Sequence, residues 1–139
     1  MATYQELKDL SEVRLREAEA LFAANLFDGC AYLAGYVVEL ALKARICKLL
    51  GINEYLDSGK LGKVYAVHDL DQLLLLSGLR GTLDPTNVAL FNNWSISVPW
   101  NPERRYEPVG SVTRQDALDI LNAIRDGTDG VYTWIKMHW

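Results

Sequence analysis

The segment from Gly29 to Leu50 restricts the fold of this chain more than any other, because as a helix it is apolar on nearly every side. Such a helix is stable in water only at the centre of a bundle or under a partner chain. Gly51 follows directly, and glycine commonly follows a helix end. We therefore predict a long helix from about Gly29 to Leu50. Its apolar faces comprise Leu33, Val37, Leu40, Ala44 and Cys47 on one side and Val38, Leu42 and Ile46 on the other.

A second long helix is predicted before it, from Tyr4 to Asn25, where apolar residues recur at helical spacing between charged ones. The connection is short, with Asp28 as a candidate N-cap, so the two helices should run antiparallel. Arg14 lies inside the apolar stripe of the first helix. Its stem could lie along the apolar surface with the guanidinium in water, or it could form half of an internal ion pair.

Shorter elements are expected in the middle of the chain. Residues 51–67 contain three glycines and should form a loop with at most one turn of helix. A helix should begin near His68 and Asp69 and end at Gly78, because apolar residues and a terminal glycine mark its extent. After Pro85, a short helical segment is predicted from Thr86 to about Trp94.

The C-terminal third begins with a loop from Ser95 to Ser111 that contains three prolines. So long a loop in a small protein is more often functional than decorative. The residues T-R-Q-D from Thr113 to Asp116 form a capping-box pattern that opens a last helix. We expect this helix to continue, kinked at its glycines, to the C-terminus. No pair of strands competes, so the prediction is an all-α up-and-down bundle in a single domain, residues 1–139.

Charge and composition exclude several classes of protein. The formal charge of -4 argues against a protein that coats nucleic acid nonspecifically, although a local basic patch is compatible with it. The N-terminal residues MATYQELKDL lack the pattern of a signal peptide, and no apolar run is long enough to span a membrane, so we expect a soluble cytoplasmic protein. Cys30 and Cys47 should be buried free thiols. With two histidines and no paired cysteines, we predict neither a metal site nor a cofactor.

A row of polar side chains interrupts the apolar helix. Tyr32, Tyr36, Glu39 and Lys43 are spaced by four, three and four residues, so all of them project from one side. They could form an exposed Glu-to-Lys pair beside two tyrosines. Alternatively, they form a polar seam that faces a cleft or a second copy of the chain, because charges in so apolar a helix usually need partners.

The loop W-N-P-E-R-R-Y, residues 100–106, has the densest set of chemically useful side chains. Arg104 and Arg105 can bind phosphate or carboxylate, and Trp100 and Tyr106 can stack on bases. The same loop could instead be a structural plug, in which Trp100 covers the bundle and one arginine pairs with Glu39 or Asp116.

The histidines have separate interpretations. His68 precedes a predicted helix, where its ring could cap the backbone, and His138 lies one residue from the end of the chain.

Four blocks of sequence together resemble small stand-alone bacterial HEPN-domain proteins. They are Y-L-A-G-Y-V-V-E-L-A-L-K-A from Tyr32, H-D-L-D-Q-L-L from His68, the W-N-P-E-R-R-Y loop, and G-V-Y-T-W-I-K-M-H-W from Gly130. The resemblance runs from about Arg14 to Trp139. It implies a helical bundle, a homodimer, and association with nucleotide binding and RNA cleavage, often beside a minimal nucleotidyltransferase partner in toxin-antitoxin or defence systems.

One feature of that family is missing. Its cleavage motif is an arginine followed four to six positions later by a histidine, whereas Arg104 and Arg105 have no histidine within that range. A metal-free ribonuclease needs a group that accepts and returns a proton. Catalysis would therefore require a fold that brings His68 next to the arginine loop.

The leading hypothesis is therefore a homodimer that binds nucleotide, RNA or a protein partner and is non-catalytic or weakly catalytic. Its groove would contain Tyr36, Glu39, Lys43, His68, Trp100, Arg105 and Tyr106. One alternative is a divergent metal-independent ribonuclease with His68, Arg104 and Arg105 as the catalytic candidates. Another is a protein-interaction module paired with a nucleotidyltransferase.

Overall fold

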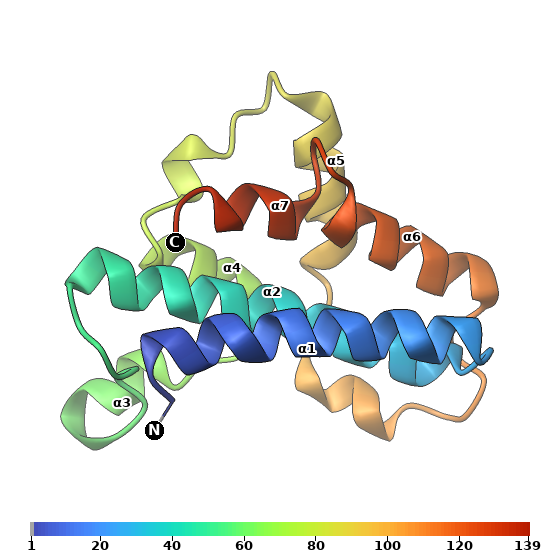
Figure 1. Cartoon of the computed structure of the whole chain (residues 1–139), viewed down its shortest axis with the longest axis horizontal. Coiled ribbons are helices and arrows are strands. Elements are labelled where there is room, and N and C mark those ends of the chain that lie inside the picture. The colour runs from blue at the N-terminus through green and yellow to red at the C-terminus, as the bar shows by residue number, and fades with distance from the viewer. Residues whose placement is uncertain (1) are drawn as a thin grey trace.

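A computed structural model of the chain describes residues 2–139, and across them the fold is all-helical (Figure 1). The two long helices, α1 (Tyr4–Ala23) and α2 (Phe27–Leu50), lie antiparallel, as predicted. The shorter elements are α3 (Gly59–Tyr65), α4 (Leu70–Leu76), the 3-10 helix η1 (Arg80–Thr82), α5 (Val88–Ser97), the 3-10 helix η2 (Pro102–Tyr106), α6 (Arg114–Arg125) and α7 (Val131–Lys136).

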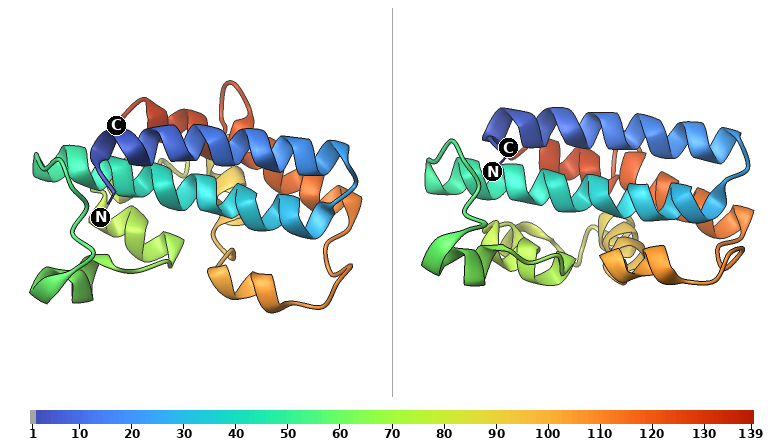
Figure 2. Two further views of the ribbon diagram at one scale, coloured as in Figure 1. Left: turned by 60° about the horizontal axis from the view of Figure 1, so that its bottom comes forward. Right: turned by 90° about the horizontal axis from the view of Figure 1, so that it is seen from below.

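Helix α2 is the centre of the bundle, as its apolar composition predicts. It contacts α1, α4, α6, α7 and η2, and Figure 2 shows α1 on one side of it and the segments containing α3, α4 and η2 on another. Val37, Val38 and Leu42 are among its fully buried residues. Cys30 and Cys47 are buried free thiols, also as predicted.

The start of α2 differs from the prediction. The helix begins at Phe27, and Leu26 is its N-cap without a side-chain hydrogen bond. Asp28 is therefore not the cap. Its carboxylate accepts hydrogen bonds from the backbone N–H groups of Gly110, at 2.7 Å, and Val112, at 2.9 Å. Asp28 thus attaches the segment after η2 to the first turn of α2.

The segment between α2 and α4 is more ordered than expected. Helix α3 has seven residues, about two turns, instead of at most one turn. Helix α4 begins after Asp69, whose carboxylate accepts a hydrogen bond from the N–H of Gln72 at 2.9 Å. Asp69 is therefore the cap, and the prediction of a capping role for His68 is wrong.

Helix α5 begins two residues later than predicted and extends to Ser97, beyond the predicted end at Trp94. Its cap is Asn87, whose side chain accepts from the N–H of Leu90. Pro85 lies in the turn before the helix. The predicted loop from Ser95 to Ser111 therefore begins as helix, and η2 occupies its middle.

The C-terminal helix is broken instead of kinked. The predicted capping box of α6 is present, with reciprocal hydrogen bonds between Thr113 and Asp116. After Arg125 the chain turns, and the carboxylate of Asp126 accepts from the N–H groups of Thr128 and Asp129. These local hydrogen bonds compete with helix continuation, because a short acidic side chain can bond the backbone just after it.

Arg14 forms a surface ion pair with Glu17 of the same helix, at 2.8 Å. Both side chains are partly exposed, at 34% and 45%, so the pair is not internal. Across residues 2–139, no helix combines the length and the apolar character that crossing a bilayer requires.

Candidate functional site

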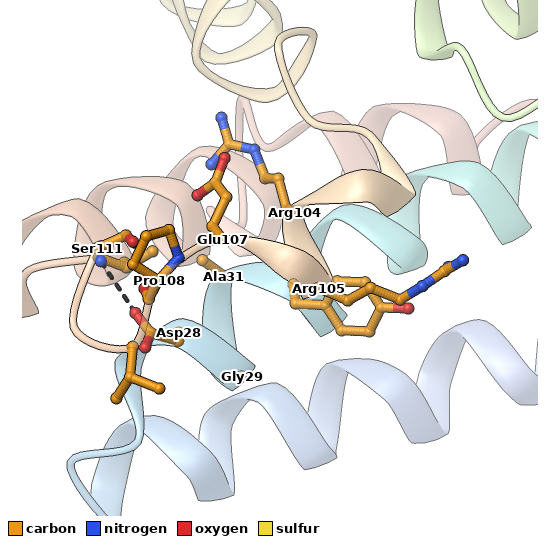
Figure 3. A pocket seen from close by; sticks show the side chains of 11 residues that line it. Asp28, Gly29, Ala31, Arg104, Arg105, Glu107, Pro108 and Ser111 are labelled. Carbon is orange, nitrogen blue, oxygen red and sulfur yellow. Dashed lines mark hydrogen bonds between the residues drawn. The ribbon is translucent and has the colours of Figure 1, made fainter.

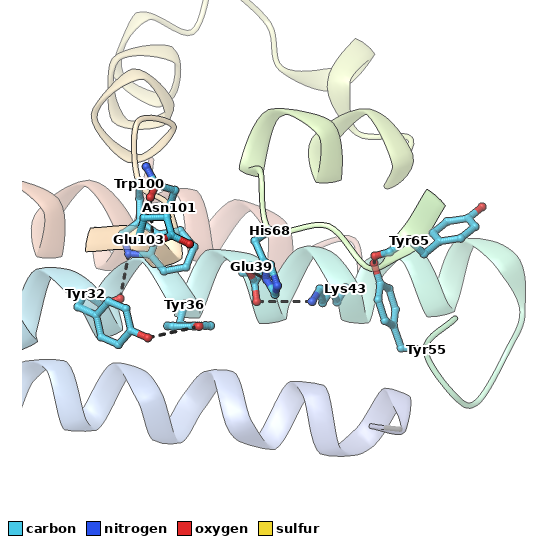
Figure 4. Close-up of polar contacts among 10 residues, drawn as sticks. All are labelled: Tyr32, Tyr36, Glu39, Lys43, Tyr55, Tyr65, His68, Trp100, Asn101 and Glu103. Carbon is cyan, nitrogen blue, oxygen red and sulfur yellow. Dashed lines mark hydrogen bonds and ion pairs between the residues drawn. The ribbon is translucent and has the colours of Figure 1, made fainter. Parts of the chain in front are cut away.

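The polar row of α2 packs against other parts of the protein, with Glu39 buried and Tyr32, Tyr36 and Lys43 half-buried (Figure 4). Glu39 is only 2% exposed, although it carries a carboxylate. The interpretation of Glu39 and Lys43 as an exposed surface pair is therefore wrong. The alternative, a polar seam that faces a cleft or a second copy of the chain, stays a prediction.

Glu39 contacts two nitrogen-bearing side chains, and we call the three residues the carboxylate cluster: Glu39, Lys43 and His68. Its Oε1 lies 2.8 Å from Nδ1 of His68, and its Oε2 lies 3.5 Å from Nζ of Lys43. The His68 side chain is 56% exposed, so one edge of its ring contacts the buried carboxylate while much of the ring meets solvent. These contacts offset the cost of removing the carboxylate from water.

Tyr55 supports the carboxylate cluster, and the sequence analysis missed it. The ammonium of Lys43 lies 5.2 Å from the centre of the Tyr55 ring. The Tyr55 hydroxyl donates a hydrogen bond to the backbone oxygen of Tyr65 at 2.6 Å. Burial raises the pKa of this phenol. Tyr55 lies in a segment that we expected to be a loop, so no helical spacing related it to Lys43.

Trp100 covers the N-terminal half of α2, as the plug interpretation requires. It is 2% exposed, and its indole N–H donates to the backbone oxygen of Tyr32 at 3.0 Å. The indole lies directly on Gly35, where a Cβ atom would overlap the ring. Glycine at this position therefore permits the close approach of the tryptophan to the helix.

Tyr32 and Tyr36 complete this aromatic contact. The ring of Tyr36 meets Trp100 edge-on, with centroids 4.9 Å apart, and meets Tyr32 at 5.2 Å. Burial, followed by the hydrogen bond from Tyr32, raises the pKa of Tyr36 to about 12. The Tyr36 phenol therefore stays neutral near pH 7.

Arg105 lies beside these tyrosines at the surface. Its guanidinium is 4.8 Å from the ring centre of Tyr106, which is itself 72% exposed. Hydrogen bonds to the hydroxyl of Tyr106 and then to that of Tyr32 raise the pKa of Arg105. We call Tyr32, Trp100, Arg105 and Tyr106 the arginine cluster.

Neither arginine of the loop forms the ion pair that the plug interpretation suggested. Glu39 pairs with Lys43 and His68 instead. Asp116 is held in the capping box of α6, where hydrogen bonds from Thr113 lower its pKa and Arg104 adds a smaller effect of the same sign. Within residues 2–139, no ion pair joins Arg104 or Arg105 to a carboxylate.

A cavity of about 270 Å³ opens beside the arginine cluster (Figure 3). Arg104, Arg105 and Tyr32 line it, together with Asp28, Glu107 and Pro108. A shallower cavity of about 470 Å³ lies between α1 and α2 and is lined by Arg14, Tyr32 and Tyr36. Tyr32 therefore separates two hollows on one face of the protein.

The two clusters lie next to each other along one side of α2 but do not merge into one enclosed niche. Tyr32 and Glu39 are seven residues apart, which corresponds to about 10 Å along a helix. Figure 4 shows Tyr32, Tyr36 and Trp100 grouped together, with Glu39, His68 and Lys43 farther along the helix. The structure thus places the candidate residues on one face, in two neighbouring groups.

The site combines arginine and aromatic side chains with the carboxylates of Glu39, Asp28 and Glu107. Among residues 2–139, no group of three or more His, Cys, Asp or Glu side chains could hold a metal ion. The arginine cluster can bind an anion and a planar ring, and the carboxylate cluster presents an oriented imidazole.

Comparison of the chain with protein-family models, with curated proteins and with solved structures finds no match.

Proposed function

We propose that this chain is a HEPN-like helical domain that binds a phosphate-bearing ligand, a nucleotide or a single strand of RNA, at the arginine cluster. Arg104 and Arg105 would bind phosphate, and the exposed ring of Tyr106 would stack on a base. The observation that carries the proposal is the position of Arg105, which lies at the rim of a cavity between two tyrosines without a carboxylate partner.

The charge of Arg105 supports anion binding because no acidic side chain neutralises it at close range. Its neighbours are the side chains of Tyr32 and Tyr106, so the guanidinium keeps free hydrogen-bonding capacity for a phosphate. The buried Trp100 fixes the start of η2 on α2 and so limits the movement of the arginine. A preordered arginine loses less entropy on binding.

The sequence resemblance supports the rest of this proposal. It implies a homodimer and a minimal nucleotidyltransferase as partner. The length of the loop that contains Pro99, Pro102 and Pro108 favours a functional role for that loop. Size-exclusion chromatography with light scattering tests the dimer. A strict monomer would contradict it and would favour a protein-interaction module whose partner is a different chain.

Fluorescence anisotropy with a short labelled single-stranded RNA tests binding, and adenosine 5′-monophosphate as competitor separates the nucleotide from the strand. Arg105→Ala should weaken binding about tenfold, because one charge-assisted contact is lost. Arg80→Ala is the matched control, since Arg80 is an exposed arginine paired with Asp71 at 3.5 Å. Equal losses in both variants, or no binding by the native chain, would contradict the proposal.

A second candidate function, metal-independent cleavage of RNA, is favoured by one observation, the contact between His68 and the buried Glu39. In such a reaction the 2′-hydroxyl oxygen attacks phosphorus while its proton passes to the imidazole. The bond to the 5′ oxygen breaks as that oxygen takes up a proton, which leaves a 2′,3′-cyclic phosphate. Arg105 lies in the other cluster and would hold the strand at another of its phosphates.

Incubation of labelled RNA with the native chain, His68→Ala and Arg105→Ala decides between binding alone and cleavage. Products that are lost in both variants would support the ribonuclease. Cleavage that survives both substitutions would indicate a contaminating enzyme, and no cleavage by the native chain would remove this candidate while leaving the binding proposal intact.

A further inference from the structure

The contact between Glu39 and His68 determines which nitrogen of the imidazole carries the proton. Nδ1 of His68 lies 2.8 Å from Oε1 of Glu39, and the Glu39 side chain is almost completely buried. An ionised carboxylate can only accept hydrogen bonds, so the nitrogen that faces it must be the donor. In a neutral imidazole the other nitrogen then carries a lone pair.

We propose that Glu39 is a positioning residue that holds His68 as the Nδ1–H tautomer and so presents Nε2 to solvent as a proton acceptor. The His68 side chain is 56% exposed as a whole, although its Nδ1 contacts a carboxylate that is almost completely buried. A buried carboxylate that orients an imidazole in this way is the arrangement by which enzymes prepare a general base.

Lys43 contributes to this arrangement through the second carboxylate oxygen. Its ammonium lies 3.5 Å from Oε2 of Glu39 and also contacts the ring of Tyr55. The carboxylate therefore has a partner on its second oxygen besides the imidazole on its first. His68 can be neutral, and accept a proton, without leaving Glu39 as an unpaired buried charge.

The location of the pair relates it to the proposed ligand site. Glu39 follows Tyr36 by three residues on the same side of α2, and Tyr36 contacts Trp100. A strand of RNA that extends from the arginine cluster along α2 would run toward His68. A role for Nε2 of His68 as proton acceptor toward a bound strand rests on the proposed function. The assignment of the Nδ1–H tautomer does not.

Long-range proton–nitrogen correlation spectra of the ¹⁵N-labelled full chain measure the tautomer directly. At a pH where both histidines are neutral, His68 should show a protonated-type shift at Nδ1 and an unprotonated-type shift at Nε2. His138, whose ring packs edge-on against Trp134 at 6.0 Å, is the internal reference and should show the Nε2–H form that an unrestrained imidazole favours.

Two variants separate a positioning role from a general loss of structure. In Glu39→Gln, His68 should shift toward the Nε2–H form, since a neutral amide can donate to Nδ1 as well as accept from it. In Lys43→Met, the carboxylate and its contact with Nδ1 remain, so the Nδ1–H form should persist. The spectrum of Val37 methyl protons, from a buried part of α2, reports whether each variant is folded.

The outcomes are distinct. A native His68 in the Nε2–H form would overturn the proposal, as would an Nδ1–H form that persists unchanged in Glu39→Gln. If Glu39→Gln does not fold, the native spectrum and Lys43→Met still decide. A confirmed tautomer in a chain that does not bind RNA would support the inference and refute the proposed function, so the two fail separately.

Discussion

The carboxylate cluster and the arginine cluster lie on the same side of α2 and are built in opposite ways. In the first, the charges are buried and paired, and Glu39 is 2% exposed. In the second, an aromatic side chain is buried and the charge remains at the surface, beside a Tyr106 that is 72% exposed. The difference teaches that a buried carboxylate needs partners that offset its removal from water, whereas a buried tryptophan needs one hydrogen-bond acceptor and leaves the neighbouring arginine without a carboxylate partner.

The largest effect should come from removing the aromatic anchor. Trp100→Ala should destabilise the protein by about 3–5 kcal/mol, because a buried indole and its packing are lost. If the two clusters are separate, the contact between His68 and Glu39 should survive in the folded fraction. Chemical denaturation measures the free energy of unfolding, and the His68 nitrogen spectrum reports the other cluster.

Gly35→Ala supplies the control for this experiment. In the native chain the added methyl group would overlap the Trp100 indole and should lower the free energy of unfolding strongly. In the Trp100→Ala variant most of this loss of stability should vanish. If the losses of stability from the two substitutions simply add, the methyl group clashes with something other than the tryptophan.

An effect of intermediate size is expected from the carboxylate cluster. Glu39→Ala leaves Lys43 without its carboxylate in a site where the lysine side chain is only 12% exposed, so we expect a loss of about 3 kcal/mol. Tryptophan fluorescence, to which the buried Trp100 contributes, should change little in the folded state. A large change would show that the clusters are coupled. Lys43→Met should cost less, since His68 still contacts Glu39.

The smallest effect should be a pH dependence at Asp28, which lines the cavity beside the arginine cluster. Hydrogen bonds from Gly110 and then Val112 lower the pKa of Asp28 from its ordinary value of 3.8. A lowered pKa means that this carboxylate stabilises the fold above its ordinary pKa and loses the contribution as pH falls through the lowered value. The amide protons of Gly110 and Val112 should therefore exchange faster, relative to other amides, in strongly acidic solution.

Asp28→Asn removes the titrating group, so the acid-dependent part of this exchange should disappear while exchange near His68 stays unchanged. An acid effect of equal size in the variant would assign the pH dependence to another carboxylate.

Much of the fold was predictable because its determinants are local. The apolar spacing of residues 29–50 and the capping box at Thr113 and Asp116 each lie within a few turns of chain, and both predictions are confirmed. The predictions were wrong where a side chain forms hydrogen bonds with a distant segment or where a local turn competes with a helix. Asp28 binds residues 110 and 112 instead of its own helix, and Asp126 ends α6 where a continuous helix was expected.

By itself the sequence determined that Tyr32, Tyr36, Glu39 and Lys43 share one side of a central helix, because helical spacing follows from the backbone alone. Only the tertiary structure decided what that side meets. His68 pairs with Glu39, Tyr55 supports Lys43, and Trp100 lies on Gly35. The physical reason is that buried charges and large rings are placed by the partners that offset their removal from water, and those partners come from distant parts of the chain.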